Sequence, residues 1–370
     1  MSHPLPSDPA LGLNYRPVLP RRRDWRIGCV GAGFIMRNCH LVAYRNAGFN
    51  PVAIASRNPA SAREAAHRHR VPKVHDTIDA LLTDDSVEIL DVAVPPDAQP
   101  DVIRRAIELG RGRLRGILAQ KPLALSLAVA RDLVTRCEGA GIVLAVNQNM
   151  RFDQSVRAAK DILNRGWLGE PVLATIDMRA IPHWMPWAEG LPSLSTFVMS
   201  IHHLDTFRYW LGTPDRVLAS TRPDPRTKFP HRDGINLYIL EYASGARASS
   251  WDDVWTGPSK EGVAGDIGIR WRIEGTDGLM QGTIGWPKYP AREPSTLEFS
   301  TRQSNGWQRP RWDDVWFPDA FAGTMAQLLV AVEDGTEPEI GGRDNLETVA
   351  LCEAVFAAAT EHRVVRMERP

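Results

Sequence analysis

Short apolar stretches alternate with amphipathic segments over the first 150 residues of the chain. The helical segments carry clear boundary signals. Asn58 and Pro59 supply an N-cap and a first-turn proline, and the segments 97–109 and 127–138 each end at a glycine. The apolar stretches have the length of strands buried on both faces, and they lie at 26–30, 52–55, 87–94, 116–119 and 142–146. Repeated strand–helix units of this kind predict a parallel sheet with right-handed crossovers.

The pattern changes near residue 150. A helix predicted over 153–164 is followed by strand-like segments that no longer alternate with helices, at 172–180, 235–243, 246–254, 270–274 and 279–285. Turn signals such as Ser244-Gly245 separate these segments, which is typical of an antiparallel sheet. One helical segment comes early in this half and two more close the chain, at 195–211, 320–333 and 345–361. The second half is therefore predicted to be α+β.

The first apolar stretch ends in a glycine turn that is typical of a dinucleotide site. Gly31 would make the tight turn, and Gly33 would let the backbone approach a pyrophosphate. Phe34 and Ile35 begin a helical pattern, and the N-terminus of such a helix presents free N–H groups to a phosphate. Met36 occupies the place of the third glycine of the fingerprint, so the motif alone does not decide.

The residues that follow the second strand bear on the type of dinucleotide. In sheets of this kind, ligands bind beyond the carboxyl ends of the strands. A carboxylate about 20 residues past the glycine turn would bind the adenosine ribose of NAD, whereas an arginine would accommodate the 2′-phosphate of NADP. Ser56 and Arg57 stand at that place, with no carboxylate. The sequence favours NADP and leaves NAD open, the alternative for Arg57 being a solvated loop residue.

The ends of the other strands add candidates for contacts with the cofactor. Pro95 and Gln99 follow the third apolar stretch, and Gln120 and Lys121 follow the fourth. Because Lys121 stands at the carboxyl end of its strand, we expect its side chain to enter the cofactor crevice.

Length and composition set the domain organisation. A chain of 370 residues is expected to fold as about two domains. We predict an α/β protein with a flexible N-terminal extension over 1–23 and a Rossmann dinucleotide-binding domain over 24–150. A substrate-binding and oligomerisation domain over 151–370 would be α+β, with a large, mostly antiparallel open sheet. An arm packed on a neighbouring subunit is the alternative for the extension.

Charge and apolar content argue against several classes of protein. The formal net charge is zero, which gives no reason to expect nucleic acid or an anionic membrane as a partner. No apolar run is long enough to span a bilayer. The four cysteines lack the spacing of a metal site, so we expect no metal and a cytoplasmic protein with reduced thiols.

Several short motifs occur in the order and spacing of a known family. They are the glycine turn at Gly31, the strand-end motif Gln120-Lys121-Pro122, a segment around Arg151, the helical motif His202-x-x-Asp205, and Gly342-Arg343-Asp344 before the last helix. Over residues 24–368 the chain resembles the glucose-fructose oxidoreductase, inositol dehydrogenase and rhizopine-catabolism (Gfo/Idh/MocA) family. The resemblance implies an NAD(P)-dependent oxidoreductase that moves a hydride between nicotinamide and a hydroxyl-bearing carbon of a sugar, polyol or glycoside.

This chemistry calls for two groups. The substrate hydroxyl loses a proton as its carbon loses a hydride, so a base must lie within hydrogen-bond reach, and His202 fits that role. A cation stabilises the developing alkoxide, and Lys121 fits that one. We therefore predict Lys121 and His202 as the catalytic residues. We expect His203 either to be structural or to support the residues that contact the substrate, and Asp205 either to orient an imidazole or to pair with Arg208.

The partner implied by the resemblance is a small-molecule carbohydrate. Lys121, Arg151, His183, Trp184 and His202 are predicted to bind it. Aromatic side chains with polar tips suit the apolar face of a sugar ring, with core or interface packing as an equal alternative. Because sheets of this kind often pair across subunits, we also expect a homodimer or homotetramer formed through the C-terminal sheet.

Two positions depart from the family pattern. Gln120 replaces a glutamate before the lysine, and Val198 stands where the family often has an aspartate, one turn before the histidine. Since valine cannot relay a proton, only Lys121 and His202 are carried over as catalytic residues. Two alternatives stay open. One is an enzyme that keeps its nucleotide bound and performs net non-redox chemistry (sugar–sugar hydride exchange or glycosidic cleavage), and the other is a non-catalytic sugar or nucleotide sensor.

Overall fold

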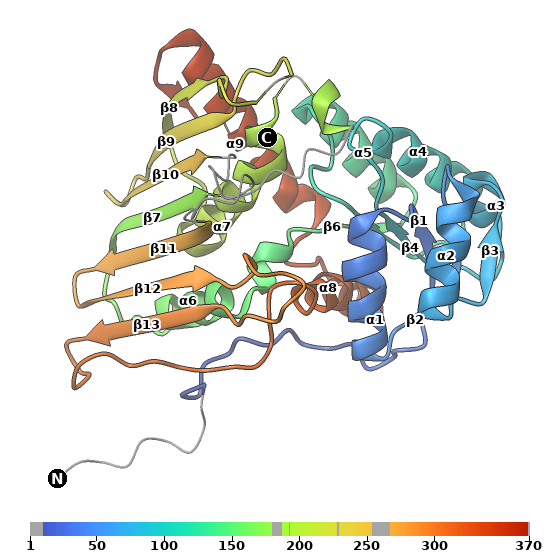
Figure 1. Cartoon of the computed structure of the whole chain (residues 1–370), viewed down its shortest axis with the longest axis horizontal. Coiled ribbons are helices and arrows are strands. Elements are labelled where there is room, and N and C mark those ends of the chain that lie inside the picture. The colour runs from blue at the N-terminus through green and yellow to red at the C-terminus, as the bar shows by residue number, and fades with distance from the viewer. Residues whose placement is uncertain (1–9, 180–186, 192, 228, 254–266, 369–370) are drawn as a thin grey trace. The chain divides into compact units, whose positions relative to one another are not determined.

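The computed structural model describes residues 10–179, 187–191, 193–227, 229–253 and 267–368 (Figure 1). Contacts within the chain divide it into two compact units. We call the first the parallel-sheet unit, which comprises Pro17–Asn149 and Phe317–Ala350. The second is the large-sheet unit, which comprises Met150–Trp316 together with residues 10–16 and 351–368. The second expected domain therefore loses residues 317–350 to the first.

Six strands form the sheet of the parallel-sheet unit. They run in the order β3-β2-β1-β4-β5-β6, and every neighbouring pair is parallel. The Rossmann-type sheet predicted from the sequence is confirmed. Its strands are β1 (Arg26–Val30), β2 (Asn50–Ala55), β3 (Lys73–His75), β4 (Ile89–Val92), β5 (Gly116–Ala119) and β6 (Val143–Val146).

Helices cover both faces of this sheet. α1 (Leu41–Ala47) packs against α2 (Pro59–His69) and α8 (Ala320–Asp334), and α4 (Gln99–Leu109) packs against α3 (Ile78–Leu82) and α5 (Leu127–Gly139). Figure 1 shows α8 lying beside α1. The side chain of Asn58 caps α2 by accepting from the backbone N–H of Ala60, which confirms the boundary signal seen in the sequence.

α8 completes the parallel-sheet unit with residues from far along the chain. Right-handed crossovers between β4, β5 and β6 place α4 and α5 on one face of the sheet, which leaves the opposite face of β5 and β6 without a local helix. α8 fills that place. A Cβ added to Gly116 on β5 would lie 2.9 Å from Leu328 and 3.1 Å from Val332. The expectation that residues 151–370 form one domain does not hold for 317–350, because their apolar side chains are buried on the parallel sheet.

The stretch 10–23 was expected to be part of a flexible extension, but it is fixed to its own chain. In the large-sheet unit, the backbone N–H of Asn14 donates to Asp161 at 3.0 Å. In the parallel-sheet unit, the backbone N–H of Arg21 donates to Glu333 on α8 at 3.0 Å. The expectation of an extension is corrected for this stretch, and the first nine residues lie outside the described part of the chain.

Eight strands form the sheet of the large-sheet unit, in the order β13-β12-β11-β7-β10-β9-β8-β14. β7 and β10 pair in parallel, and the other pairs are antiparallel. The mostly antiparallel sheet predicted for this half is confirmed. Its strands are β7 (Pro171–Arg179), β8 (Arg216–Arg222), β9 (Ile235–Glu241), β10 (Arg247–Asp253), β11 (Gly268–Gly275), β12 (Gly278–Ile284), β13 (Thr296–Thr301) and β14 (Val365–Arg366).

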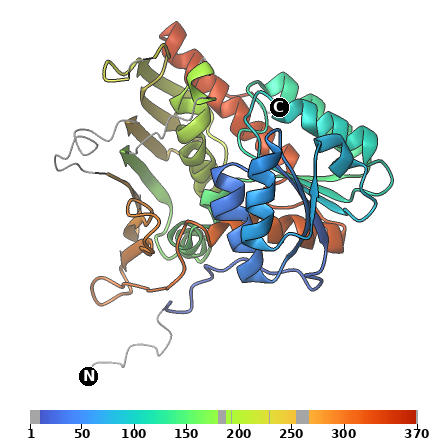
Figure 2. The same cartoon turned by 45° about the vertical axis from the view of Figure 1, so that its right-hand side comes forward.

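The helices of this unit lie against one face of its sheet (Figures 1 and 2). α6 (Gln154–Asn164) packs on β12 and β13, and α7 (Ile201–Leu211) packs on β7. The last helix, α9 (Gly342–Glu361), begins in the parallel-sheet unit and ends in the large-sheet unit. The described residues also form four shorter helical turns: η1 (Met36–His40), η2 (Asn149–Phe152), η3 (Ala188–Gly190) and η4 (Thr196–Ser200).

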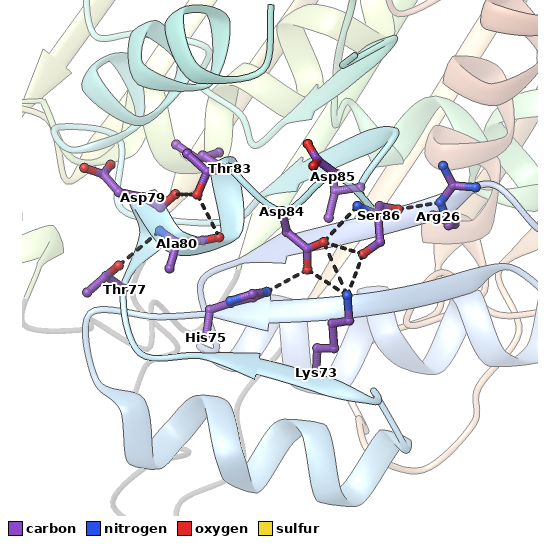
Figure 3. Close-up of polar contacts among 12 residues, drawn as sticks. Arg26, Lys73, His75, Thr77, Asp79, Ala80, Thr83, Asp84, Asp85 and Ser86 are labelled. Carbon is purple, nitrogen blue, oxygen red and sulfur yellow. Dashed lines mark hydrogen bonds and ion pairs between the residues drawn. The ribbon is translucent and has the colours of Figure 1, made fainter.

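A buried carboxylate ties β3 to the loop that precedes β4 (Figure 3). The side chain of Asp84 is 8% exposed and lies 2.9 Å from Nε2 of His75 and 3.2 Å from Nζ of Lys73. It also accepts from the backbone N–H and the hydroxyl of Ser86. Burial acts to raise the pKa of Asp84, but the hydrogen bonds from Ser86, His75 and Lys73 outweigh it and lower that pKa.

We expect Asp84→Asn to destabilise the protein by about 1–3 kcal/mol at neutral pH, since it weakens several hydrogen bonds to a buried charge. The pKa of Asp84 is lower in the folded than in the unfolded chain. The carboxylate therefore stabilises the fold above its ordinary pKa of 3.8, and this contribution is lost as the pH falls below it. Urea denaturation of the unaltered protein and of Asp84→Asn, from pH 7 to pH 3, measures the difference between their free energies of unfolding. This difference should become smaller in acid. If it is the same at pH 7 and at pH 3, the stabilising role of the Asp84 carboxylate is contradicted.

Candidate functional site

The turn between β1 and the first helix is built around Gly31. Its φ of 100° lies in the region that favours glycine, and a Cβ there would collide with the carbonyl of Ala93 just after β4. Gly33 has the opposite surroundings, because a Cβ added to it would meet nothing within 4 Å. The turn thus leaves open space beside the backbone of Gly33, as the close approach of a pyrophosphate requires.

The first helix begins with an unusually wide turn. Phe34 and Ile35 are half-buried and lead into the π-helical turn η1, which precedes α1. Met36, in the place of the third fingerprint glycine, is fully buried at the start of η1. A turn with i→i+5 hydrogen bonds is wider than an α-helical one, and such turns are frequent at functional sites. The larger side chain at Met36 is therefore accommodated without closing the space at Gly33.

The other predicted cofactor contacts lie at the ends of neighbouring strands. Ser56 follows β2 and is half-buried, and Arg57 next to it is exposed. Pro95 follows β4, and its carbonyl accepts from the backbone N–H of Gln99 at the start of α4. Since β2, β1, β4 and β5 are adjacent in a parallel sheet, their carboxyl ends lie along one edge, which is where dinucleotides bind.

Gln99 holds the lysine-bearing loop. Its side chain, which the sequence predicts as a cofactor contact, is fully buried, and both ends of its amide bind this loop. Its amide nitrogen donates to the carbonyls of Gln120 and Pro122 at 2.7 and 2.9 Å, and to that of Leu123 at 3.2 Å. Its amide oxygen accepts from the backbone N–H of Gln120 at 2.8 Å. The loop that carries Lys121 is thus fixed on both sides of the lysine.

The side-chain amide nitrogen of Gln120 is an unsatisfied hydrogen-bond donor at the same edge of the sheet. Its amide oxygen accepts from the backbone N–H of Lys121 at 2.9 Å and lies 3.3 Å from Nδ2 of Asn147. Its buried amide nitrogen has no hydrogen-bond partner among the residues that the structure describes. With the open space at Gly33, this unsatisfied donor makes the edge suited to a ligand rich in oxygen, and a nicotinamide dinucleotide fits that description.

In the large-sheet unit, one buried carboxylate orders the segment before α7. Asp233 accepts from the hydroxyls of Ser193 and Thr196 at 2.7 and 2.5 Å. It also accepts from the backbone N–H of Leu194 and of Thr196. These bonds satisfy donors at the start of the π-helical turn η4, which continues into α7. The helix that carries His202 therefore has a fixed beginning.

The two adjacent histidines of α7 have different surroundings. His202 is 5% exposed, and its ring makes an edge contact with Trp316 at 5.8 Å between centroids. His203 is fully buried, and its Nδ1 lies 2.8 Å from Asp252 on β10. The structural role expected for His203 agrees with this geometry. Val198 lies in η4, one turn before His202, and is half-buried.

Arg151 is held by Asp205. Its Nε and one terminal nitrogen lie 2.6 and 2.7 Å from the two carboxylate oxygens, in a bidentate pair that is almost fully buried. Nη1 of Arg208 also lies 3.8 Å from Oδ1 of Asp205. Asp205 thus pairs with arginines, and Arg151, predicted to bind substrate, has much of its donor capacity used inside the protein. His183 and Trp184 lie outside the described residues.

The amino-acid sequence matches two family models, one on each side of residue 150. Residues 25–148 match the oxidoreductase family with an NAD-binding Rossmann fold, and residues 156–281 match the GFO/IDH/MocA C-terminal domain. The chain belongs to the GFO/IDH/MocA family of oxidoreductases. The resemblance drawn from the short motifs is thereby confirmed.

Relatives in the GFO/IDH/MocA family align with nearly the whole chain. D-apiose dehydrogenase of Paraburkholderia graminis is 25% identical over 357 residues, which cover 92% of this chain and 88% of that protein. Inositol 2-dehydrogenase of Rhizobium meliloti is 26% identical over 348 residues, covering 92% and 98%. An oxidoreductase of Agrobacterium radiobacter, solved with NAD+, L-tartaric acid and magnesium, has the same fold at a TM-score of 0.79 and 23% identity, covering 93% and 98%.

Sequence reasoning missed several residues that shape this GFO/IDH/MocA site. Asp233 lies far from α7 in sequence, and no motif marks it. Asn147 directly follows β6, so its place at a strand end was a usable signal. His40 and Asp91 lie in an amphipathic helix and an apolar strand, where periodicity gives no reason to single them out.

No helix in the described part of the chain is long and apolar enough to cross a membrane.

Proposed function

We propose that this protein is an NADP-dependent dehydrogenase that oxidises a hydroxyl-bearing carbon of a sugar, polyol or glycoside. The observation that carries the proposal is the edge of the parallel sheet, where the open turn at Gly33 and the loop bearing Lys121 follow neighbouring strands. Membership of an oxidoreductase family supports the type of reaction. The names of the aligned relatives, a sugar dehydrogenase and an inositol dehydrogenase, support a polyhydroxylated substrate.

The proposed chemistry assigns one role to each catalytic candidate. A bound nicotinamide nucleotide would accept the hydride that leaves the substrate carbon. Lys121, held by its loop, would stabilise the alkoxide as the hydroxyl loses its proton. His202 would take that proton. Gly31, Gly33, Phe34 and Ile35 would receive the pyrophosphate, with Pro95 and Gln120 bordering the nucleotide and Arg151 supporting the substrate side. Because Val198 cannot relay a proton, the proton would pass directly to the imidazole.

The preference for NADP is proposed from the end of β2. Ser56 and Arg57 stand where a carboxylate would select NAD, and the exposed guanidinium of Arg57 suits a 2′-phosphate. We expect the protein to bind NADPH more tightly than NADH, and Arg57→Ala to weaken NADPH binding about 10-fold or more while leaving NADH almost unchanged. Quenching of tryptophan fluorescence measures both affinities. Tighter binding of NADH by the unaltered protein would remove this role from Arg57.

We further propose a homodimer or homotetramer formed through the large sheet. The face of β7, β9 and β10 that bears Leu173, Leu237, Ile239 and Trp251 leaves these side chains 37–46% exposed. Exposed apolar residues grouped on one face are typical of an interface. Light scattering coupled to size-exclusion chromatography gives the number of subunits. A cytoplasmic location is proposed because the four cysteines are buried thiols that are not joined in disulfides.

A substrate screen tests the function directly. The purified protein is incubated with sugars, inositols and glycosides and with each oxidised nucleotide, and the absorbance of the reduced nicotinamide is followed. We expect reduction with at least one polyhydroxylated compound and a faster rate with NADP+. If no compound is oxidised although the protein binds nucleotide, the dehydrogenase assignment is wrong.

A further inference from the structure

A chain of hydrogen bonds runs through the parallel-sheet unit from β4 to the backbone of Lys121. It starts at Asp91, whose Oδ2 lies 2.7 Å from Nδ1 of His40. Nε2 of His40 lies 2.9 Å from Nδ2 of Asn147, which is 3.3 Å from Oε1 of Gln120. That oxygen accepts from the backbone N–H of Lys121 at 2.9 Å. We call Asp91, His40, Asn147 and Gln120 the Asp91 chain.

The two ends of the Asp91 chain determine every hydrogen position between them. The backbone N–H of Lys121 can only donate, so Gln120 must present its oxygen, and Asn147 must then present its amino group. Because that amino group also faces Nε2 of His40, this nitrogen must accept and the ring hydrogen must be on Nδ1. That hydrogen points to Asp91, which can only accept. Flipping either amide would place two donors or two acceptors against each other.

Packing alone does not explain why polar residues occupy these interior positions. The side chains of Asp91, His40 and Asn147 are buried, and apolar residues in their places would avoid the cost of removing polar groups from water. A further donor, the hydroxyl of Tyr44, reaches Asp91 at 2.6 Å and strengthens the fixed end. Asp91 Oδ1, Asn147 Oδ1 and Gln120 Nε2 have no hydrogen-bond partner among the described residues, but the four linked contacts specify one arrangement of the chain, which ends at the lysine loop.

The same loop is held from its other side by Gln99, whose amide binds the backbone at residues 120, 122 and 123. Gln99 fixes the course of the loop. The Asp91 chain instead contacts the one backbone N–H that belongs to Lys121 itself. Two separate sets of hydrogen bonds therefore restrain the backbone from which the lysine side chain departs.

We propose that the Asp91 chain is a positioning device that sets the orientation of Lys121 for catalysis. This inference rests on the proposed function, in which Lys121 lies beside the reacting hydroxyl. It also gives a reason for the glutamine before the lysine. An amide has one accepting and one donating end, so Gln120 can close the chain with its oxygen and keep its nitrogen for a ligand, without placing a negative charge beside Lys121.

The test interrupts the Asp91 chain at Asn147 and compares substitutions of two aspartates, Asp91 and Asp84. Asn147→Leu keeps the branching of the side chain at Cγ and removes the link between His40 and Gln120. We expect its kcat to fall about 10- to 100-fold, because a small displacement of a catalytic group is enough for such a loss, while nucleotide affinity stays within about 3-fold. Asp91→Asn should act in the same direction. The double variant should lose no more than Asn147→Leu alone, since the two residues act through one chain.

Asp84→Asn is the matched control. It makes the same change in a second aspartate that is paired with a histidine in the same unit, but Asp84 links β3 to the loop before β4 (Figure 3), whereas the Asp91 chain ends at the loop after β5. We expect it to lower thermal stability and leave kcat unchanged. Wild-type kcat in Asn147→Leu, losses that multiply in the double variant, or an equal loss in Asp84→Asn would each overturn the proposal.

A second measurement needs neither substrate nor the Asp91→Asn variant. Hydrogen exchange at the backbone amide of Lys121, followed by mass spectrometry, should be faster in Asn147→Leu than in the unaltered protein, because the acceptor on Gln120 is no longer held in place. Unchanged exchange would overturn the proposal. If the unaltered protein oxidises no carbohydrate, the proposed function fails, and the exchange result still decides whether the chain restrains the lysine loop.

Discussion

Lys121→Ala is expected to abolish turnover, with kcat lowered about 1,000-fold or more, because it removes the cation that we propose to stabilise the developing alkoxide. Nucleotide affinity should stay within a few-fold, since the turn at Gly31 and Gly33 is untouched. Steady-state kinetics on the best substrate of the screen, together with fluorescence titration of NADPH, measures both quantities.

Two further variants make this result specific. Lys121→Met keeps the length of the side chain without its charge and should lose as much activity as the alanine variant. Lys288→Ala removes an exposed lysine that pairs with Glu293 in the large-sheet unit, and it should leave kcat unchanged. Turnover that survives in both Lys121 variants would show that another group stabilises the alkoxide.

Arg151→Met should lower the free energy of unfolding by about 3–5 kcal/mol, because it leaves Asp205 as a buried charge without its bidentate partner. The side chains of both residues are at most 4% exposed. Denaturant unfolding monitored by tryptophan fluorescence gives the loss. The double variant Arg151→Met/Asp205→Leu should recover a large part of it, since both charges are then removed together.

This comparison also separates two roles for Arg151. If it mainly anchors α7 through Asp205, the double variant regains stability and retains a substrate KM close to that of the unaltered protein. If Arg151 binds the substrate, as the sequence predicts, the KM should rise in the single and in the double variant alike. A single variant as stable as the unaltered protein would contradict the first role.

The parallel-sheet unit was largely predictable from local pattern. Apolar stretches ended in turn residues, and the rule that ligands bind at the carboxyl ends of strands singled out Gly31, Gly33, Ser56 and Lys121. The structure has these residues at the ends of β1, β2 and β5, which are members of one sheet. Strand β3 was missed because its three residues, Lys73–His75, carry no apolar alternation and depend on pairing with β2.

The roles of polar residues were less predictable, because they depend on partners far away in sequence. The position of Gln99 predicts a cofactor contact, but it gives no sign that the amide of Gln99 binds a loop 21–24 residues further on. Arg151 finds Asp205 across 54 residues. His202 and His203 are neighbours with equal intrinsic chemistry, and only the packing of α7 on the large sheet distinguishes the one paired with Asp252. No periodicity carries such information.

The place of α8 has a consequence for the order in which the protein can form. The parallel-sheet unit needs the apolar residues of α8, such as Phe321, Leu328 and Leu329, to cover one face of β5 and β6, although all of its six strands end by residue 149. During synthesis at about 5–20 residues per second, the first part of this unit emerges many seconds before its last helix. Until then an apolar sheet face remains uncovered. The core of the parallel-sheet unit is thus completed only when most of the large-sheet unit has already been made.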